Sequence, residues 1–255
     1  MMRIDDKVAI VTGSSSGIGL AITRRFLDAG GRVFGVDRSE AHASVAGRNG
    51  FQHLTIDLTA KGAPEEAVAA CESRLGPVDI LINNAGIGAA KPLLETTDED
   101  LYRYIAINLA APFALCRSAI GRMRGRGGAV VNMASVFGIV GVASSSAYGV
   151  TKGAIVQMTR QFATEFGRDG IRVNAIAPGL ISSPLTAERI AAKGWFRNSF
   201  IDASPLARAG EADEIAMAAL FLSSPAAAFI TGVVLPVDGG WSAAKMLPDP
   251  ATADL

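Results

Sequence analysis

The chain has 255 residues, of which 49% are apolar and 19% charged, so it can bury a large core and corresponds to one or two domains. Its 24 basic and 24 acidic residues cancel, and without a basic excess we expect no nucleic-acid partner. Two cysteines and two isolated histidines exclude a disulfide scaffold and a structural zinc site, so no metal is predicted. This cysteine usage is typical of a reducing compartment and favours a cytoplasmic location.

No membrane segment is expected. The N-terminus, MMRIDDKVAIVTG, is charged and then becomes strand-like, which is unlike a signal peptide. Residues 216–237 carry no charge and are long enough to cross a bilayer. Breakers at 223–225 and 231–232 divide this stretch, so we predict a short buried helix followed by a β-rich run from Val233.

Seven short runs rich in β-branched residues recur between amphipathic stretches. They are apolar almost throughout rather than alternating, which is typical of strands covered on both faces. The stretches between them have helical spacing, since Ile18, Ile22 and Phe26 share one face, as do Ile155 and Met158. The predicted strands are 8–11, 32–36, 53–56, 80–82, 129–133, 172–176 and 233–237.

This alternation predicts an α/β Rossmann fold, a doubly wound, mostly parallel sheet of about seven strands with helices on both faces. No linker or composition break divides residues 1–255, so we expect a single domain. Residues 180–208 contain no predicted strand and are interpreted as a substrate lid. The tail 242–255, which contains two prolines, is expected to be loosely ordered.

A glycine-rich turn, TGSSSGIG at 12–19, follows the first predicted strand and opens the first helix. Glycines in such a turn let backbone N–H groups approach a pyrophosphate, which the helix N-terminus also attracts. The spacing is GxxxGxG rather than GxGxxG, and a tight strand-to-helix loop is the alternative interpretation. The position after the first strand favours a dinucleotide site.

Asp37 ends the second predicted strand, 18 residues after Gly19. An acid there accepts hydrogen bonds from an adenosine ribose and repels a 2′-phosphate. The alternatives are that Asp37 only caps the turn before Ser39, or that Arg38 beside it attracts a phosphate. No lysine or arginine lies in the glycine-rich turn, so charge repulsion favours NAD over NADP.

Tyr148 and Lys152 stand four residues apart on one face of a predicted helix. A neighbouring ammonium favours the phenolate, so this pair can act as a general base. By itself the YxxxK pattern more often marks a solvated helix face. Ser135, at the end of a predicted strand, supplies a hydroxyl for the reacting oxygen.

Asn108 lies in the long helical stretch 98–120, four residues before Pro112. Proline has no N–H, so the carbonyl of residue 108 loses its helical partner and the helix should kink. A free carbonyl facing a cleft can bind water, and a kink packed in the core is the alternative.

Together these motifs resemble the short-chain dehydrogenase/reductase family, NAD(P)-dependent oxidoreductases of about 250 residues, a length that suits one large α/β domain. The resemblance covers almost the whole chain, and the order and spacing of the motifs make it specific. The matching motifs are TGSSSGIG at 12–19, Asp57-Leu58, Asn83-Asn84-Ala85-Gly86, Asn108, Ser135, Tyr148 with Lys152, and Pro178-Gly179.

The resemblance implies four catalytic residues. Tyr148 would be the acid/base, Ser135 would orient the substrate oxygen, and Asn108 would anchor a water in a proton relay. Lys152 would hold the nicotinamide ribose and lower the pKa of Tyr148.

The resemblance also implies a cofactor site along the chain. Asp57 would meet the adenine, and Ser183, in place of the more usual threonine, would contact the nicotinamide carboxamide. The full expected set is Gly13, Ser15, Ser16, Gly17, Ile18, Gly19, Asp37, Arg38, Asp57, Leu58, Asn84, Ala85, Gly86, Tyr148, Lys152, Pro178, Gly179, Ile181 and Ser183.

The leading interpretation is an NAD-dependent oxidoreductase that interconverts a secondary alcohol and a ketone. A sugar, sugar acid or small hydroxy acid is favoured as substrate, because Arg189, Lys193 and Arg197 in the expected lid can hold a carboxylate. Trp195 and Phe196 can instead pack on an apolar ring, and a solvated cationic face is a further alternative. The other functions considered are an NADPH-dependent ketoreductase, of the 3-oxoacyl thioester or steroid type, and a non-catalytic dinucleotide-binding protein.

Family resemblance also suggests a homotetramer. The uncharged stretch 216–237 supports this, because it offers much apolar surface at one edge of the sheet.

Overall fold

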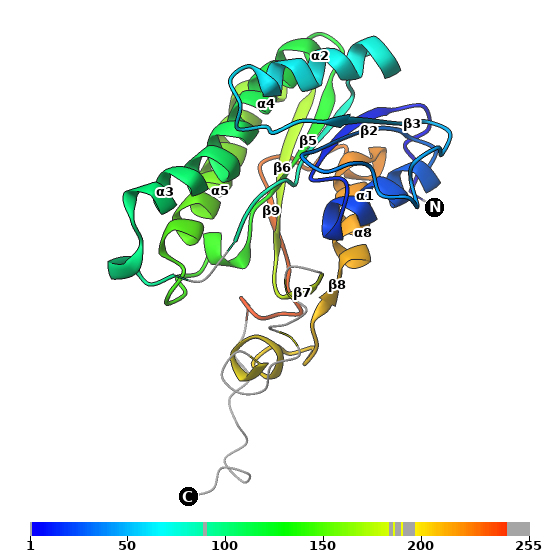
Figure 1. Ribbon diagram of the computed structural model, residues 1–255. Coiled ribbons are helices and arrows are strands. Elements are labelled where there is room, and N and C mark those ends of the chain that lie inside the picture. The colour runs from blue at the N-terminus through cyan, green and yellow to red at the C-terminus, as the bar shows by residue number, and fades with distance from the viewer. Residues whose placement is uncertain (1, 89–90, 184–185, 187–189, 191–196, 244–255) are drawn as a thin grey trace, which may run out of the picture.

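Figure 1 shows the computed structural model, which describes residues 2–88, 91–183, 186, 190 and 197–243. Seven parallel strands form one sheet in the order β3-β2-β1-β4-β5-β6-β9. The order reverses beside β1, as the predicted doubly wound fold requires, and the expectation of about seven strands is confirmed. The strands are β1 (Val8–Thr12), β2 (Arg32–Asp37), β3 (Phe51–Thr55), β4 (Ile80–Asn83), β5 (Gly128–Met133), β6 (Ile171–Pro178) and β9 (Val234–Val237).

Helices cover both faces of this sheet (Figure 1). On one face, α1 (Gly17–Asp28) packs beside α8 (Ala212–Ser223), and on the other lie α2 (Ala63–Leu75), α4 (Ala111–Met123) and α5 (Ser146–Phe166). In β1, Val8 and Ile10 belong to one hydrophobic core while Ala9 and Val11 belong to the other. Successive strand residues point to opposite faces, and both faces are buried, which explains the unbroken apolar runs of the sequence.

Short helical segments complete the described part of the chain. Four are 3-10 turns and two are π-helical, η2 and η5. They are η1 (Leu93–Glu95), η2 (Ala106–Ala110), η3 (Val136–Gly138), η4 (Gly167–Asp169), η5 (Asn198–Asp202) and η6 (Pro225–Ala227).

Two strand predictions were wrong in detail. β3 begins at Phe51 rather than at residue 53, because the turn ends at Gly50 (φ +79°) and Phe51 already pairs with Val33. The segment expected to contain no strand holds β7 (Ile181–Ser182), which pairs in parallel with β8 (Gly210–Glu211). A two-residue strand has too few positions to show a period in the sequence.

The stretch predicted as one kinked helix is divided into three segments. These are α3 (Asp98–Ile105), the π-helical η2 and α4, so the interruption before Pro112 is a π-helical turn. Among the described residues, the combined stretch Asp98–Met123 is long and apolar enough to cross a membrane by length and composition. The same composition suits a core helix, and α4 buries Leu115 and Met123 beneath the sheet.

The uncharged stretch 216–237 forms the rest of α8, then η6, then β9. The predicted helix and β-rich run are therefore both present. Ile215, Ala219 and Leu222 of α8 are fully or almost fully buried between α1 and the sheet. Phe229, after η6, lies fully exposed.

Gly138 in η3 and Gly153 in α5 lie beside each other and test how tightly these two segments pack. A Cβ on Gly138 would lie 2.6 Å from the backbone C and O atoms of Lys152, whereas a Cβ on Gly153 would meet nothing closer than 3.7 Å. We expect Gly138→Ala to lower the free energy of unfolding by about 1–3 kcal/mol through overpacking. Gly153→Ala, inside the helix, should raise it by about 0.5–1 kcal/mol. Urea unfolding of both variants measures the difference, and equal stabilities would contradict this packing.

Candidate active site

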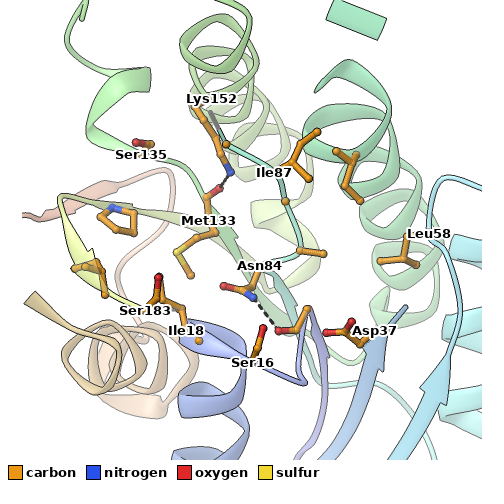
Figure 2. A pocket seen from close by; sticks show the side chains of 18 of the residues that line it. Ser16, Ile18, Asp37, Leu58, Asn84, Ile87, Met133, Ser135, Lys152 and Ser183 are labelled. Atoms are coloured by element: carbon orange, nitrogen blue, oxygen red, sulfur yellow. Dashed lines mark hydrogen bonds between the residues drawn. The ribbon is translucent and has the colours of Figure 1, made fainter. Parts of the chain in front are cut away.

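A cavity of about 450 Å³ opens at the carboxyl ends of the central strands, where ligands bind in open α/β sheets. In Figure 2, Asp37 and Ser135 lie at opposite ends of it. Of the predicted site residues, Ser15, Gly19, Asp57 and Asn108 do not line its wall. Those that do are Gly13, Ser16, Gly17, Ile18, Asp37, Arg38, Leu58, Asn84, Ala85, Gly86, Ser135, Tyr148, Lys152, Pro178, Gly179, Ile181 and Ser183.

The glycine-rich turn brings the start of α1 against the end of β1. Gly13 (φ +66°) adopts a conformation that favours glycine, and a Cβ on Gly19 would lie only 2.0 Å from the Gly13 carbonyl oxygen. Ser16 is the N-cap residue of α1, and its side chain makes no capping bond within the described chain. The N–H groups of the first turn are therefore free to bind an anion such as a pyrophosphate.

The turn is tied to the end of β4 by hydrogen bonds. The Thr12 hydroxyl accepts from the backbone N–H groups of Asn84 and Ala85, both at 3.0 Å. The Asn84 side chain donates to the Thr12 carbonyl at 2.9 Å. These contacts fix the strand-end loop of residues 84–86 beside the glycine-rich turn, on the wall of the cavity (Figure 2).

Asp37, the last residue of β2, is held by two backbone groups. One carboxylate oxygen accepts from the N–H of Ser15 and the other from the N–H of Ser39, each at 3.0 Å. Each carboxylate oxygen can accept a second hydrogen bond, so the group can still bind ribose hydroxyls. Arg38 follows it on the cavity wall.

Asp57 follows β3 and does not itself line the cavity. Its carboxylate accepts from the Thr59 N–H at 2.9 Å and from the Thr59 hydroxyl at 2.8 Å. These bonds lower its pKa, with a smaller contribution from the charge of Arg38. The neighbouring Ile56 and Leu58 form the cavity wall instead. The adenine role expected for Asp57 stays a prediction.

Lys152 is buried at the base of the cavity, with 6% of its surface exposed. It extends from α5 and donates to the Met133 carbonyl at 2.7 Å (Figure 2). Burial penalises the ammonium and lowers the pKa of Lys152 to about 8. The side chain is therefore charged at neutral pH and loses its charge in mildly alkaline solution.

Tyr148 lies on the same helix, and its ring centroid is 5.8 Å from the Lys152 ammonium. Burial raises the pKa of Tyr148, and a hydrogen bond with the Ser135 side chain opposes that rise. Desolvation of the phenolate is the largest of these effects, so the net pKa of Tyr148 is raised in the protein alone, and the expectation that Lys152 lowers this pKa stays a prediction. Ser135 and Tyr148 both line the cavity, so the structure places the two side chains in the same site.

Aromatic rings enclose Tyr148 and connect it to the region after β7. Phe137 contacts the Tyr148 ring edge-on, with the two centroids 6.0 Å apart. Phe137 also contacts Phe200 of η5, and Phe200 stacks on Trp241 at 5.5 Å. The Trp241 indole N–H donates to the Ser199 carbonyl at 2.7 Å. We refer to Phe137, Phe200 and Trp241 as the aromatic cluster.

Asn108 acts on the site through the backbone of Ile87. Its side-chain oxygen accepts from the Ile87 N–H at 2.9 Å, and its side-chain nitrogen donates to the Ile87 carbonyl at 3.0 Å. The same nitrogen donates to the Thr151 hydroxyl at 3.3 Å. Asn108 is 1% exposed, and its hydrogen bonds fix the loop that leads to Gly88, where a Cβ would lie 3.3 Å from the Tyr148 ring. The water-binding role of its carbonyl stays a prediction.

Several lining residues had no sequence signal. Met133 contributes a backbone carbonyl, and Gly88, which has no side chain, leaves space for the Tyr148 ring. Neither property has a characteristic sequence motif. The further lining residues that sequence reasoning missed are Val36, Ser39, Ile56, Ile87, Gly88, Ile107, Met133, Ala134 and Thr186.

The expected lid is only partly described. Ser183 hydrogen-bonds Thr186, and Ser183 lies opposite Gly17 across the cavity mouth, since a Cβ on Gly17 would meet its Cβ at 3.7 Å. Arg197 faces Asp202 at 3.6 Å. Arg189, Lys193, Trp195 and Phe196 lie outside the described residues, as does the tail from residue 244. No group of three or more possible metal-ligating side chains occurs within the described ranges.

Comparison with known proteins agrees with this geometry. A family model described as enoyl-(acyl carrier protein) reductase matches residues 13–242. The chain is 39% identical to the galactitol 2-dehydrogenase (L-tagatose-forming) of Cereibacter sphaeroides, over 95% of this chain and 97% of that protein. It is 35% identical to a 3-oxoacyl-acyl-carrier-protein reductase of Vibrio cholerae, over 94% of this chain and 98% of that protein.

A solved structure shows the same fold. The gluconate 5-dehydrogenase from Burkholderia cenocepacia, crystallised with NADP and tartrate, matches with a TM-score of 0.89 and 32% identity, over 95% of this chain and 98% of that one. The chain therefore belongs to the short-chain dehydrogenase/reductase family. It is an oxidoreductase of the type that acts on CH–OH groups with a nicotinamide dinucleotide.

Tyr148→Phe should remove proton transfer while keeping the ring in its aromatic surroundings. Loss of general acid/base catalysis lowers kcat by about 10²–10⁴-fold, and dinucleotide binding should be retained. Tyr102→Phe, on the exposed face of α3, is the matched control and should leave kcat unchanged. Activity of Tyr148→Phe within a few-fold of the unmodified enzyme would disprove the acid/base role.

Lys152 should make dinucleotide binding depend on pH. If Lys152 holds the nicotinamide ribose as expected, its ammonium would give a charged hydrogen bond below a pKa of about 8, and above it only a weaker neutral one would remain. The dissociation constant should therefore rise as pH passes through about 8. Lys152→Met should bind about tenfold more weakly at pH 7 and show no such step. Lys61→Met, at an exposed position, serves as the control, and a step that survives in Lys152→Met would assign the titration to another group.

Proposed function

We propose that this protein is an NAD-dependent oxidoreductase that interconverts a secondary alcohol and a ketone on a sugar, sugar acid or small hydroxy acid. The observation that carries the cofactor preference is the Asp37 carboxylate on the cavity wall, held by two backbone N–H groups. A carboxylate in this position accepts from the hydroxyls of an adenosine ribose and repels a 2′-phosphate.

The residues around the cavity fit a dinucleotide. The glycine turn leaves space that a Cβ would fill, the first turn of α1 offers N–H groups, and Lys152 places a cation at the opposite end. The bound nicotinamide supplies the hydride chemistry, as acceptor in oxidation and donor in reduction. The protein itself provides orientation and proton transfer.

Proton transfer is assigned to Tyr148 and orientation to Ser135. In oxidation, the Tyr148 phenolate takes the proton of the substrate hydroxyl, and Ser135 donates a hydrogen bond to the same oxygen. In reduction, the Tyr148 hydroxyl returns the proton. Burial raises the pKa of Tyr148, so oxidation by these residues is favoured by alkaline pH and reduction by neutral pH.

The names of relatives support a polar substrate. Galactitol 2-dehydrogenase, L-fucose dehydrogenase and gluconate 5-dehydrogenase are named for polyols, sugars and sugar acids. The alternative is an NADPH-dependent ketoreductase, favoured by Arg38 on the cavity wall, by the 3-oxoacyl reductase relative and by the NADP in the structural neighbour. The presence of Ser135, Tyr148 and Lys152 on the wall of one cavity disfavours a protein that only binds dinucleotides, since binding does not require an acid/base.

We also propose that the protein is a cytoplasmic homotetramer. Support comes from exposed apolar side chains beside the outer strand β9 and on α8, where Phe229 is fully exposed and Met217 is 37% exposed. Such surface is commonly covered by a second copy in oligomers. Sedimentation equilibrium at micromolar concentration measures the assembly, and a monomer there would contradict the proposal.

The cofactor preference is tested through Asp37. With its carboxylate at contact distance from a 2′-phosphate, the unmodified enzyme should favour NAD over NADP by about 10²-fold in kcat/KM. Asp37→Ser should narrow this ratio, because Arg38 then meets the phosphate without opposition. Asp28→Ser, which removes the same charge from an exposed residue at the end of α1, should leave the ratio unchanged. Equal or better use of NADP by the unmodified enzyme would favour the reductive alternative.

A further inference from the structure

Two buried polar atoms lie near Gly35 of β2, in residues that do not line the cavity. The Ser14 hydroxyl and the Nδ1 atom of His53 are shielded from solvent, and neither has a hydrogen-bond partner within the described part of the chain. Both lie close to Gly35, since a Cβ there would be 2.6 Å from the Ser14 oxygen and 3.1 Å from His53 Nδ1. Gly35 pairs with His53 across β2 and β3, so the absence of a side chain makes room for both groups.

The other nitrogen of the same imidazole binds the loop after β2. His53 Nε2 donates to the Ser39 carbonyl at 3.0 Å, because a carbonyl oxygen can only accept. In the neutral ring Nδ1 is then an acceptor, and a hydroxyl such as that of Ser14 is the complementary donor. His53 therefore has one polar atom toward the loop after β2 and one toward the glycine-rich turn.

Ser39 is the point where these contacts meet Asp37. The Ser39 N–H donates to one oxygen of the Asp37 carboxylate, and the Ser15 N–H donates to the other. The Ser15 hydroxyl also donates to the Ser39 carbonyl at 3.3 Å. A shift of Ser39 would therefore move a group that orients the Asp37 carboxylate, although His53 itself does not line the cavity.

We infer that His53 is a positioning residue for cofactor specificity, which holds the Asp37–Arg38–Ser39 loop against the glycine-rich turn. It donates to the Ser39 carbonyl and accepts from the Ser14 hydroxyl through one water. The inference rests on the proposed function in that Asp37 is taken as the ribose-binding group. Without His53, the Asp37 carboxylate loses its fixed orientation and Arg38 gains freedom to approach a phosphate.

The test is calorimetric titration with NAD and with NADP, separately, of the full chain and four variants. His53→Leu should weaken NAD binding about tenfold, through the loss of the hydrogen bond that holds Ser39, and change NADP binding by less than about threefold. His53→Gln, which keeps a donor and an acceptor, should restore most of the affinity for NAD. Ser14→Ala, a smaller change, should weaken NAD binding about threefold. His42→Leu removes the other imidazole, which hydrogen-bonds Ser44 in an exposed loop, and should change nothing.

The outcomes separate a positioning role from a structural one. If His53→Leu lowers the affinities for NAD and NADP equally along with the melting temperature, or leaves the NAD:NADP ratio unchanged, the inference is wrong. If the unmodified protein prefers NADP, the proposed NAD preference fails, but His53→Leu still has to shift the ratio and His53→Gln has to return it. If His53→Leu does not fold, the inference is tested with Ser14→Ala and His53→Gln instead. An NAD:NADP affinity ratio that is unchanged in Ser14→Ala then overturns the inference.

Discussion

The arrangement at the carboxyl edge of the sheet depends on one close approach between two stretches of backbone. A Cβ on Gly19 would overlap the Gly13 carbonyl oxygen, so the first turn of α1 can lie directly against the end of β1 only because residue 19 is glycine. Thr12 and Asn84 then join that turn to the end of β4, on the side of β1 opposite to β2. The cavity is thus built across the point where the strand order reverses, with free N–H groups on one wall and β5 on another.

Burial dominates the electrostatics at the catalytic end. It raises the pKa of Tyr148 and lowers that of Lys152, so the protein alone disfavours phenolate and ammonium alike. Lys152 keeps its charge at neutral pH and donates a hydrogen bond to the Met133 carbonyl. Ser135 has the effect that lowers the pKa of Tyr148 and so favours the phenolate. The positions of these groups are therefore set before any ligand binds. The protonation state of the buried Tyr148 hydroxyl, in contrast, depends on the charges and hydrogen bonds that a bound ligand supplies.

The sequence was sufficient to predict the features that have a hydrophobic period or a fixed motif spacing. The parallel sheet, the glycine turn, Asp37 at the end of β2 and the association of Ser135 with Tyr148 were all predictable, because buried strands and strand-end motifs leave direct patterns. What could not be predicted depends on three-dimensional burial or on backbone atoms. The rise in the pKa of Tyr148 follows from its burial, which the sequence does not show. The hydrogen bond that Lys152 makes to Met133 involves a backbone carbonyl, which every residue has. Two-residue strands such as β7 are too short to show a period.

The aromatic cluster has a consequence for how this enzyme type diversifies. Phe200 and Trp241 come from two segments that follow the catalytic helix, yet they contact Phe137, which touches the Tyr148 ring directly. The segment around η5 is therefore not an independent module that can be exchanged to suit a new substrate. A segment exchanged for the one around η5 has to match residues 137 and 241, because these residues pack together beside the Tyr148 ring. We therefore expect sequence changes in the segment around η5 to alter the position of the Tyr148 ring.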